Sequence, residues 1–189
     1  MFEVELKAHV DNRNFVIEKL TSFATYDASI KKEDTYWGRI VGGKKIQARV
    51  RKEVGSSGKK NYFTYKQKEL RESSDGIEIE VNDEKECEIF DIAPIEAFFK
   101  DMQLDIFLEK TKSVMSWYFA DAHIELCTVP PLGDFLEIEI LSETSSESDI
   151  ASCREKILSI FAMCGITEDK IESRYYSEML RECGKSGES

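Results

Sequence analysis

The stretch that decides the fold is LGDFLEIEI, residues 132–140, where apolar and acidic side chains alternate in the second half. Successive side chains of a β-strand point to opposite faces of the sheet. The segment therefore predicts a strand with Glu137 and Glu139 on one face and Leu136, Ile138 and Ile140 on the other. One face of such a sheet packs on a core, and the other carries charge.

The same alternation recurs in five other segments. Their charged sets, spaced two residues apart, are Glu3, Glu5 and Lys7; Arg49 and Arg51; Lys66 and Lys68; Glu78 and Glu80; and Lys110 and Lys112. A solvated sheet face explains any single set, but such a face usually mixes both signs, whereas most of these sets have one sign. If about eight antiparallel strands close into a barrel, all the sets can point into one lumen. The expected fold is α+β, a closed eight-stranded antiparallel β-barrel with helices packed outside.

Turn residues and hydrophobic spacing divide the sequence into strands and helices. The expected strands cover residues 2–10, 34–41, 46–54, 62–68, 76–81, 107–119, 123–129 and 135–142. Apolar residues at helical spacing predict helices over residues 16–23, 94–102 and 150–164, with a last short helix over 175–180. Because no repeat or linker interrupts the pattern, residues 1–183 are expected to form one domain and residues 184–189 a flexible tail.

Composition narrows the classes of function. The 189 residues include 26 Lys and Arg against 37 Asp and Glu, and the net charge of −11 argues against binding to nucleic acid or to an anionic membrane. A small internal cationic site could still bind a polyanion. Five widely spaced cysteines without a C-x-x-C pair fit neither a disulfide framework nor a zinc ribbon. With charges near the N-terminus and no apolar run of roughly 20 residues, a cytoplasmic protein without a signal peptide is expected.

A lumen lined by cations and carboxylates indicates a class of ligand. Buried charges are costly unless they are compensated, and a triphosphate with a divalent cation compensates both kinds. Lys and Arg bind phosphate oxygens, whereas carboxylates hold Mg²⁺ or Mn²⁺. His123, Glu125 and Cys127 share one strand face and could ligate zinc, but no second cluster of zinc ligands accompanies them. The segment 42–45, GGKK, lacks the spacing of a P-loop.

Several motifs together resemble the CYTH domain, also called the triphosphate tunnel metalloenzyme fold. The start of the chain, residues 3–7, resembles the E-x-E-x-K signature of that family. Further matches are Asp34-Thr35-Tyr36 to D-x-Y, Arg49-Val50-Arg51 to R-x-R, Thr64-Tyr65-Lys66 to T-x-K, Lys110-Thr111-Lys112 to K-x-R, and residues 132–139 to LG-x-F-x-E-I-E. The resemblance spans essentially the whole chain and is greatest to the bacterial class IV adenylyl cyclases. Other members are inorganic and thiamine triphosphatases.

The resemblance implies roles for individual residues. It assigns triphosphate binding to Lys7, Arg49, Arg51, Lys66, Lys110 and Lys112. It assigns a site for Mg²⁺ or Mn²⁺ to Glu3, Glu5, Glu137 and Glu139, with Glu125, Glu78 and Glu80 as further candidates. The implied reaction is conversion of ATP to cyclic AMP and diphosphate. The alternatives are hydrolysis of another triphosphate and binding without catalysis, and a homodimer remains open.

Two positions depart from the family pattern. Cys127 stands where the family usually has an aspartate that helps the metal site, and Lys112 stands where K-x-R has arginine. Cys127 is either the remnant of a lost metal ligand, for which Glu125 could substitute, or a small buried apolar residue. Lys112 keeps the positive charge but loses the bidentate geometry of arginine.

Overall fold

The computed structural model describes residues 2–72 and 78–186, except for the side chains of residues 44, 45, 66–70, 72, 83, 185 and 186. Within these residues the strands are β1 (Phe2–His9), β2 (Thr25–Val41), β3 (Lys44–Gly55), β4 (Gly58–Glu72), β5 (Glu78–Ile89), β6 (Asp105–Phe119), β7 (Ala122–Val129) and β8 (Gly133–Ser142). The helices are α1 (Arg13–Phe23), α2 (Ala93–Asp101), α3 (Glu147–Met163), the 3₁₀ turn η1 (Glu168–Lys170) and α4 (Tyr176–Ser186).

The strands form one strongly curled antiparallel sheet. Its pairing order is β1-β5-β4-β3-β2-β6-β7-β8, and β8 pairs in turn with β1. The β1–β5 seam is short, with three residue pairs between Glu3–Asn82 and Glu5–Glu80. β1 and β7 have 8 residues, whereas β2, β4 and β6 have 15 to 17, so the long strands run past the seam and flare apart.

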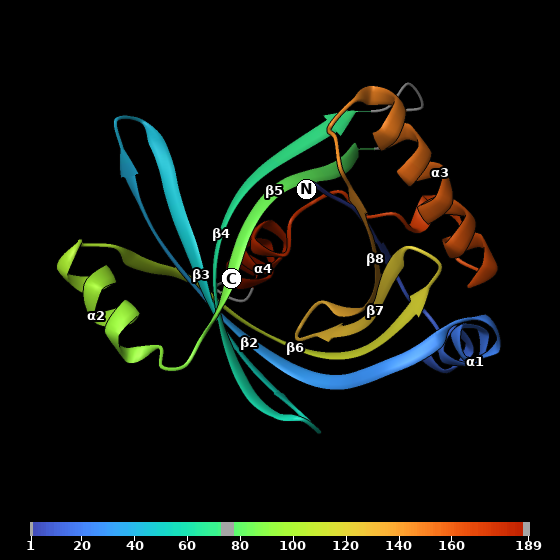
Figure 1. The fold of residues 1–189 in the computed structure, drawn as a ribbon, viewed down its shortest axis with the longest axis horizontal. Helices are drawn as coiled ribbons and strands as arrows, with labels where there is room; N and C mark the ends of the chain where they lie inside the picture. The colour runs from blue at the N-terminus through green and yellow to red at the C-terminus, as the bar shows by residue number, and fades with distance from the viewer. Residues whose placement is uncertain (1, 73–77, 187–189) are drawn as a thin grey trace.

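The flared strands give the sheet the shape of a half-barrel around an open lumen (Figure 1). The expected mixed fold, with an antiparallel sheet and outer helices, is confirmed. The eight expected strands pair in one ring, which closes at the short β1–β5 seam. The ring of paired strands is complete only near this seam. Farther along, β1 ends before the longer strands do, and they extend beyond it.

The apolar side chains of the alternating strands face outward, most of them toward α1 and α3, and those around Trp37 of β2 and Val50 of β3 toward Phe99 of α2. Leu6 of β1 and Ile138 of β8 pack with Leu20 of α1 and with Ile157 and Phe161 of α3, and all five are at most 3% exposed. Figure 1 shows α1 and α3 on the convex side of the sheet. The main core therefore lies between the sheet and these helices, and the charged side chains face the lumen.

Helix α4 lies on the concave side of the sheet (Figure 1). Its Tyr176 and Met179 pack on Val114, Cys127 and Phe135, which project from β6, β7 and β8. This second apolar cluster covers one end of the lumen. Residues 184–186, which the sequence analysis assigns to a flexible tail, continue α4 as helix.

Three strands are much longer than the sequence predicts, and one of them, β4, covers Gly58–Glu72 instead of residues 62–68. β2 begins at Thr25 instead of residue 34, and β5 continues to Ile89 instead of ending at residue 81. The additional part of β5, NDEKECEI, has charges on both faces and shows no hydrophobic alternation. Its pairing with β4 makes it a strand.

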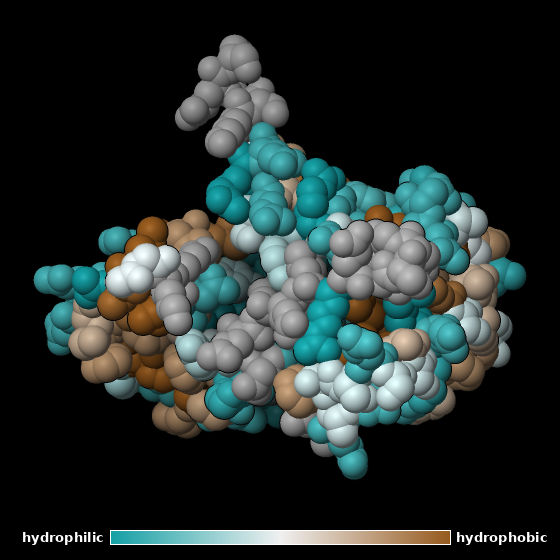
Figure 2. Space-filling model, turned by 90° about the horizontal axis from the view of Figure 1, so that it is seen from above, coloured by the Kyte–Doolittle hydropathy of each residue, from teal (hydrophilic) through white to brown (hydrophobic). Residues whose placement is uncertain are grey.

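Exposed hydrophobic side chains gather on the flared ends of the strands and on α2. They are Ile40, Val41, Ile46, Phe98, Met102 and Ile106. The brown surface toward the left of Figure 2 lies on the side of the molecule that α2 occupies in Figure 1. None of the described helices has the length and apolar run needed to cross a membrane.

Candidate functional site

The lumen contains a cavity of about 550 Å³ on which most of the predicted site residues converge. Those that line it are Glu3, Glu5, Lys7, Arg49, Arg51, Glu80, Lys110, Lys112, Glu125, Glu137 and Glu139. Glu78 is not among the lining residues, and the side chain of Lys66 lies outside the described residues. Segments far apart in the sequence therefore bring cations and carboxylates into one space.

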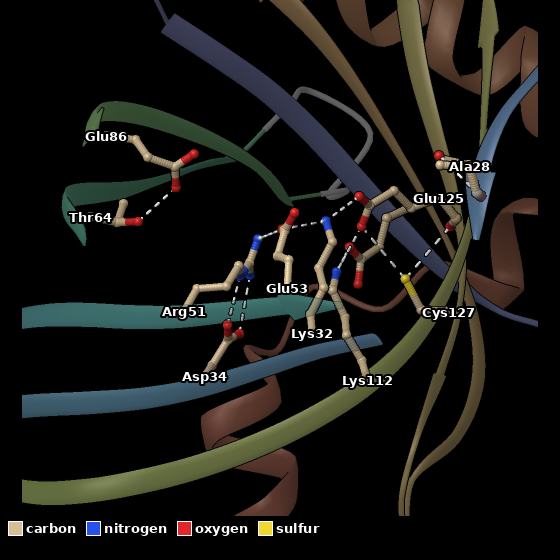
Figure 3. A network of polar contacts seen from close by, with 12 residues as sticks. Ala28, Lys32, Asp34, Arg51, Glu53, Thr64, Glu86, Lys112, Glu125 and Cys127 are labelled. Atoms are coloured by element: carbon tan, nitrogen blue, oxygen red, sulfur yellow. Dashed lines mark hydrogen bonds and ion pairs between the residues drawn. The ribbon is translucent and has the colours of Figure 1, made fainter. Parts of the chain in front are cut away.

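Arg51 and Lys110 share one buried carboxylate, that of Asp34 on β2. Arg51 donates from Nε and Nη2 to the two oxygens of Asp34 at 2.6 and 3.1 Å (Figure 3). Lys110 Nζ lies 3.3 Å from Oδ2 of the same carboxylate. Burial raises the pKa of Asp34, but the positive charges of Arg51 and Lys110 outweigh it and hold that pKa well below its ordinary value. Asp34 thus remains ionised and fixes both cations.

Arg49 is held by side chains of β4 and β5. Its Nη2 donates to Thr64 Oγ1 at 3.0 Å and to Glu84 and Glu86 at 3.1 Å each. The Thr64 hydroxyl donates to Glu86 at 2.7 Å. A guanidinium held against an array of oxygens in this way can also bind the oxygens of a phosphate.

A row of carboxylates crosses three neighbouring strands on the lumen side, and we call Glu5, Glu80 and Glu139 the acidic row. Glu5 on β1 is directly opposite Glu80 on β5 and Glu139 on β8. Like charges at opposed positions destabilise a sheet. Lys7 Nζ, 3.8 Å from Glu80 Oε1, offsets part of this charge, and a further cation beside the row is favourable.

Glu3 is opposite Asn82, whose buried carbonyl oxygen has no hydrogen-bond partner among the described residues. Oxygens are the ligands that a hard divalent cation such as Mg²⁺ or Mn²⁺ prefers. Among the described side chains, however, Glu125, Cys127 and Glu137 bring three ligand atoms within 4.8 Å of one another, whereas those of the acidic row do not.

Another pair of lumen carboxylates is bridged by lysines, and we call Lys32, Lys112, Glu125 and Glu137 the lysine cluster. Lys112 donates to Glu125 at 2.9 Å and to Glu137 at 2.7 Å, and Lys32 donates to the other oxygen of Glu125 (Figure 3). Burial opposes ionisation of Glu137, but Lys112 lowers the pKa of that carboxyl to about 2. The two lysines likewise hold the pKa of Glu125 well below its ordinary value against the effect of burial.

Cys127 has features of both alternatives considered for it. The side chain is fully buried in the apolar cluster beneath α4, yet Sγ lies 3.8 Å from a carboxylate oxygen of Glu125. Burial and the charge of Glu137 raise the pKa of the thiol well above its ordinary value. Cys127 is therefore a protonated thiol, which is a poor ligand for Mg²⁺. The described acidic and sulfur groups that come together here are Glu125, Cys127 and Glu137, without the His123 of the zinc hypothesis.

Several residues that line the lumen are not indicated by the sequence, among them Glu84, Glu86, Lys32 and Tyr176. Lys32 lies two residues before Asp34 on the same face of β2, and the period-two pattern would identify it if the strand were known to begin at Thr25. Tyr176 of α4 donates its hydroxyl to Glu137, and its ring centroid lies 4.8 Å from Lys110 Nζ and 5.6 Å from Lys7 Nζ. No local pattern in the sequence indicates that α4 enters the lumen.

Comparisons with known structures agree on the fold. A protein from Pyrococcus horikoshii has a TM-score of 0.77 and 24% identity, covering 95% of this chain and 98% of its own. A provisionally named adenylate cyclase from Vibrio parahaemolyticus has a TM-score of 0.70 and 17% identity, covering 96% and 98%. A Hippeastrum protein described as having a dominant triphosphatase activity has a TM-score of 0.61 and 12% identity, covering 96% and 95%. Such low identities establish the fold alone.

The sequence itself decides the family. No protein of curated function matches it. The model of the CYTH domain family matches residues 1–176, a range that includes all the described strands and extends to Tyr176 at the start of α4. The curled sheet and its charged lumen are thus those of a member of the CYTH domain family, to which this chain belongs.

Proposed function

We propose that this protein is a divalent-metal-dependent adenylyl cyclase that converts ATP into cyclic AMP and diphosphate. The observation that carries the proposal is a single cavity lined both by Arg49, Arg51 and Lys110 and by the acidic row. CYTH family members bind triphosphates and generally depend on divalent metal ions. The cavity volume, about 550 Å³, is within the usual range for small-molecule sites.

The cations of the lumen are suited to a triphosphate. Arg49 and Arg51 offer planar donor groups for pairs of phosphate oxygens, whereas Lys7 and Lys110 supply point charges. Arg51 and Lys110 are already positioned by Asp34, so little ordering is needed when the substrate binds. Lys66, which lies on β4, remains a further candidate for phosphate binding.

The acidic row, together with Glu3 and Asn82 beside it, is the proposed binding site for Mg²⁺ or Mn²⁺. The buried carbonyl oxygen of Asn82 supports this assignment because such an oxygen is costly to leave unpaired. When bound, the cation would offset the charge of the triphosphate as bonds to phosphorus form and break. The side chains of the acidic row thus place the cation site beside the cationic groups that bind phosphate.

In the proposed reaction, the ribose 3′-oxygen attacks the α-phosphorus in line with the departing diphosphate. The new bond joins the 3′-oxygen to phosphorus, and the bond from the α-phosphorus to the bridging oxygen breaks. The proton of the 3′-hydroxyl passes to a carboxylate of the acidic row. Tyr36, Phe107 and Leu108 also line the cavity and offer the apolar surface against which an adenine ring can pack.

Triphosphate hydrolysis is the second candidate. The same cations would hold the triphosphate, but a water molecule instead of the ribose hydroxyl would attack phosphorus. The Hippeastrum neighbour, described as having a dominant triphosphatase activity, favours this alternative. Binding without turnover is the remaining possibility.

Product analysis distinguishes these functions. We expect incubation with ATP and Mg²⁺ or Mn²⁺ to yield cyclic AMP and diphosphate in equal amounts, measured by ion-exchange chromatography. Release of orthophosphate from ATP or tripolyphosphate would assign a triphosphatase instead. If the protein binds ATP but forms no product, it is a triphosphate-binding protein without catalytic activity.

A matched pair of variants connects the products to the lumen. Glu139→Gln keeps the shape of the side chain but removes a charge from the acidic row, so we expect turnover to fall by about 100-fold or more. Glu109→Gln makes the same change at an exposed position on β6 and should leave turnover unaltered. Equal effects of the two substitutions would contradict the assignment of the acidic row.

A further inference from the structure

We propose that the ammonium group of Lys112 takes the place of a divalent cation in the lysine cluster, so that the protein binds its divalent cation at the acidic row alone. The inference rests on the proposed function for the role of that cation. That Lys112 occupies the cluster follows instead from the distances between its Nζ and the carboxylates of Glu125 and Glu137. In this position Lys112 does not bind phosphate, the role that the family resemblance implies for it.

The surroundings of Lys112 have the layout of a cation site. One ligand atom from each of Glu125, Cys127 and Glu137 lies within 4.8 Å of the others, and all three residues are buried. Lys112 reaches this group from β6, with Nζ 2.9 Å from Glu125 and 2.7 Å from Glu137. One positive centre thus joins carboxylates of β7 and β8, as a bridging metal ion would.

Each carboxylate oxygen of the cluster already accepts a hydrogen bond. Glu125 accepts from Lys32 at Oε1 and from Lys112 at Oε2 (Figure 3). Glu137 accepts from the Tyr176 hydroxyl at Oε1 and from Lys112 at Oε2. Two carboxylates and two ammonium groups make the cluster electrically neutral. A metal ion placed between these two carboxylates would have to displace the ammonium group of Lys112 that already lies there.

Displacement of Lys112 would strand its charge inside the protein. The side chain is 5% exposed, and the nearby Asp34 already pairs with Arg51 and Lys110. A buried charge without a partner is strongly unfavourable. The third potential metal ligand, the sulfur of Cys127, is a soft donor and would contribute little to binding of Mg²⁺ or Mn²⁺.

The test is a titration of the full-length protein with Mn²⁺ in the absence of triphosphate, with free Mn²⁺ measured by electron paramagnetic resonance. Lys112→Met removes the ammonium group but keeps much of the side-chain volume. We expect this variant to bind one Mn²⁺ ion more per chain than the unaltered protein. Lys32→Met is the matched control, since it changes the net charge equally but leaves Lys112 between Glu125 and Glu137. An additional ion in neither variant, or in both, would overturn the proposal.

A second measurement applies even if Lys112→Met fails to fold. In the otherwise unaltered protein, Glu125→Gln should leave Mn²⁺ affinity unchanged, whereas Glu139→Gln should weaken it about tenfold or more. A comparable loss from Glu125→Gln would overturn the proposal. Because no triphosphate is present, failure to bind or convert ATP would refute the proposed function without changing these Mn²⁺ results.

Discussion

At the residue scale, the lumen cations are positioned by carboxylates that remain ionised despite burial. Asp34 accepts from Arg51 and lies 3.3 Å from Lys110 Nζ, while Glu125 accepts from Lys32 and Lys112. Buried ion pairs contribute little net stability compared with well-packed apolar residues. Their benefit here is orientation, because side chains that are already fixed need less ordering when a polyanion binds.

Replacing Cys127 tests whether the carboxylate expected from the family pattern can be restored. The position is fully buried in the apolar cluster, and Glu125 lies 3.8 Å away, so Cys127→Asp would bury a second negative charge. We expect the free energy of unfolding to fall by about 2–4 kcal/mol, with no gain in Mn²⁺ affinity. Urea unfolding and Mn²⁺ titration measure the two effects. Cys127→Ser, similar in size and uncharged, should cost less, whereas a tighter Mn²⁺ site at unchanged stability would contradict the prediction.

At the element scale, the sequence predicts strands wherever one face is apolar and fails where both faces are polar. The alternation around Glu137 identifies β8 and places its charges in the lumen, as the structure confirms. The end of β5, from Asn82 to Ile89, carries no such signal because its order comes from hydrogen bonds to β4. Lys32 is missed for a related reason, since the polar first part of β2 conceals the strand that carries it.

Helix α4 shows a different limit of prediction. A short helix near residues 175–180 is predicted from its apolar spacing, and α4 begins at Tyr176. Its location on the concave side depends on contacts of Met179 and Tyr176 with residues more than 35 positions earlier, such as Phe135. Such long-range packing leaves no local pattern in a single sequence.

Tyr176 provides a test of how strongly α4 is fixed to the lumen. Tyr176→Phe keeps the ring but removes the hydroxyl that donates to Glu137. A buried carboxylate oxygen then loses its donor, so we expect the free energy of unfolding to fall by about 1–3 kcal/mol in urea unfolding. Tyr26→Phe removes a hydroxyl from a ring that is 51% exposed, and this substitution should change the free energy of unfolding by less than about 0.5 kcal/mol. Equal small effects would show that the hydroxyl contact does not hold α4.

At the scale of the whole molecule, the net charge of the chain conceals a site that contains charges of both signs. The chain carries a net charge of −11, yet its cavity includes Lys7, Arg49, Arg51 and Lys110. Bulk charge argues against a large polyanion on the outer surface, but it places no restriction on a small one inside the curled sheet. The fold separates the two regions by turning the charged face of each strand inward.

Acid should destabilise the whole molecule through the carboxylates of the lumen. Although burial opposes ionisation, neighbouring cations hold the pKa values of Asp34 and Glu125 well below their ordinary values and lower that of Glu137 to about 2. In the unfolded chain the corresponding values are 3.8 for Asp and 4.5 for Glu, so the unfolded state binds protons at higher pH. The stabilisation is therefore complete above about pH 4.5 and is lost as the pH falls toward 2.

Urea unfolding at a series of pH values between 7 and 3 measures this loss. Each carboxylate that is ionised in the folded state and protonated in the unfolded state contributes at most about 1.4 kcal/mol per pH unit. The unaltered protein should lose stability increasingly steeply below about pH 4.5, and Glu125→Gln should flatten the decline because one of these groups is removed. Glu109→Gln, at an exposed position outside the lumen, should follow the unaltered protein. A decline of the same steepness in Glu125→Gln would show that acid sensitivity arises outside the lysine cluster.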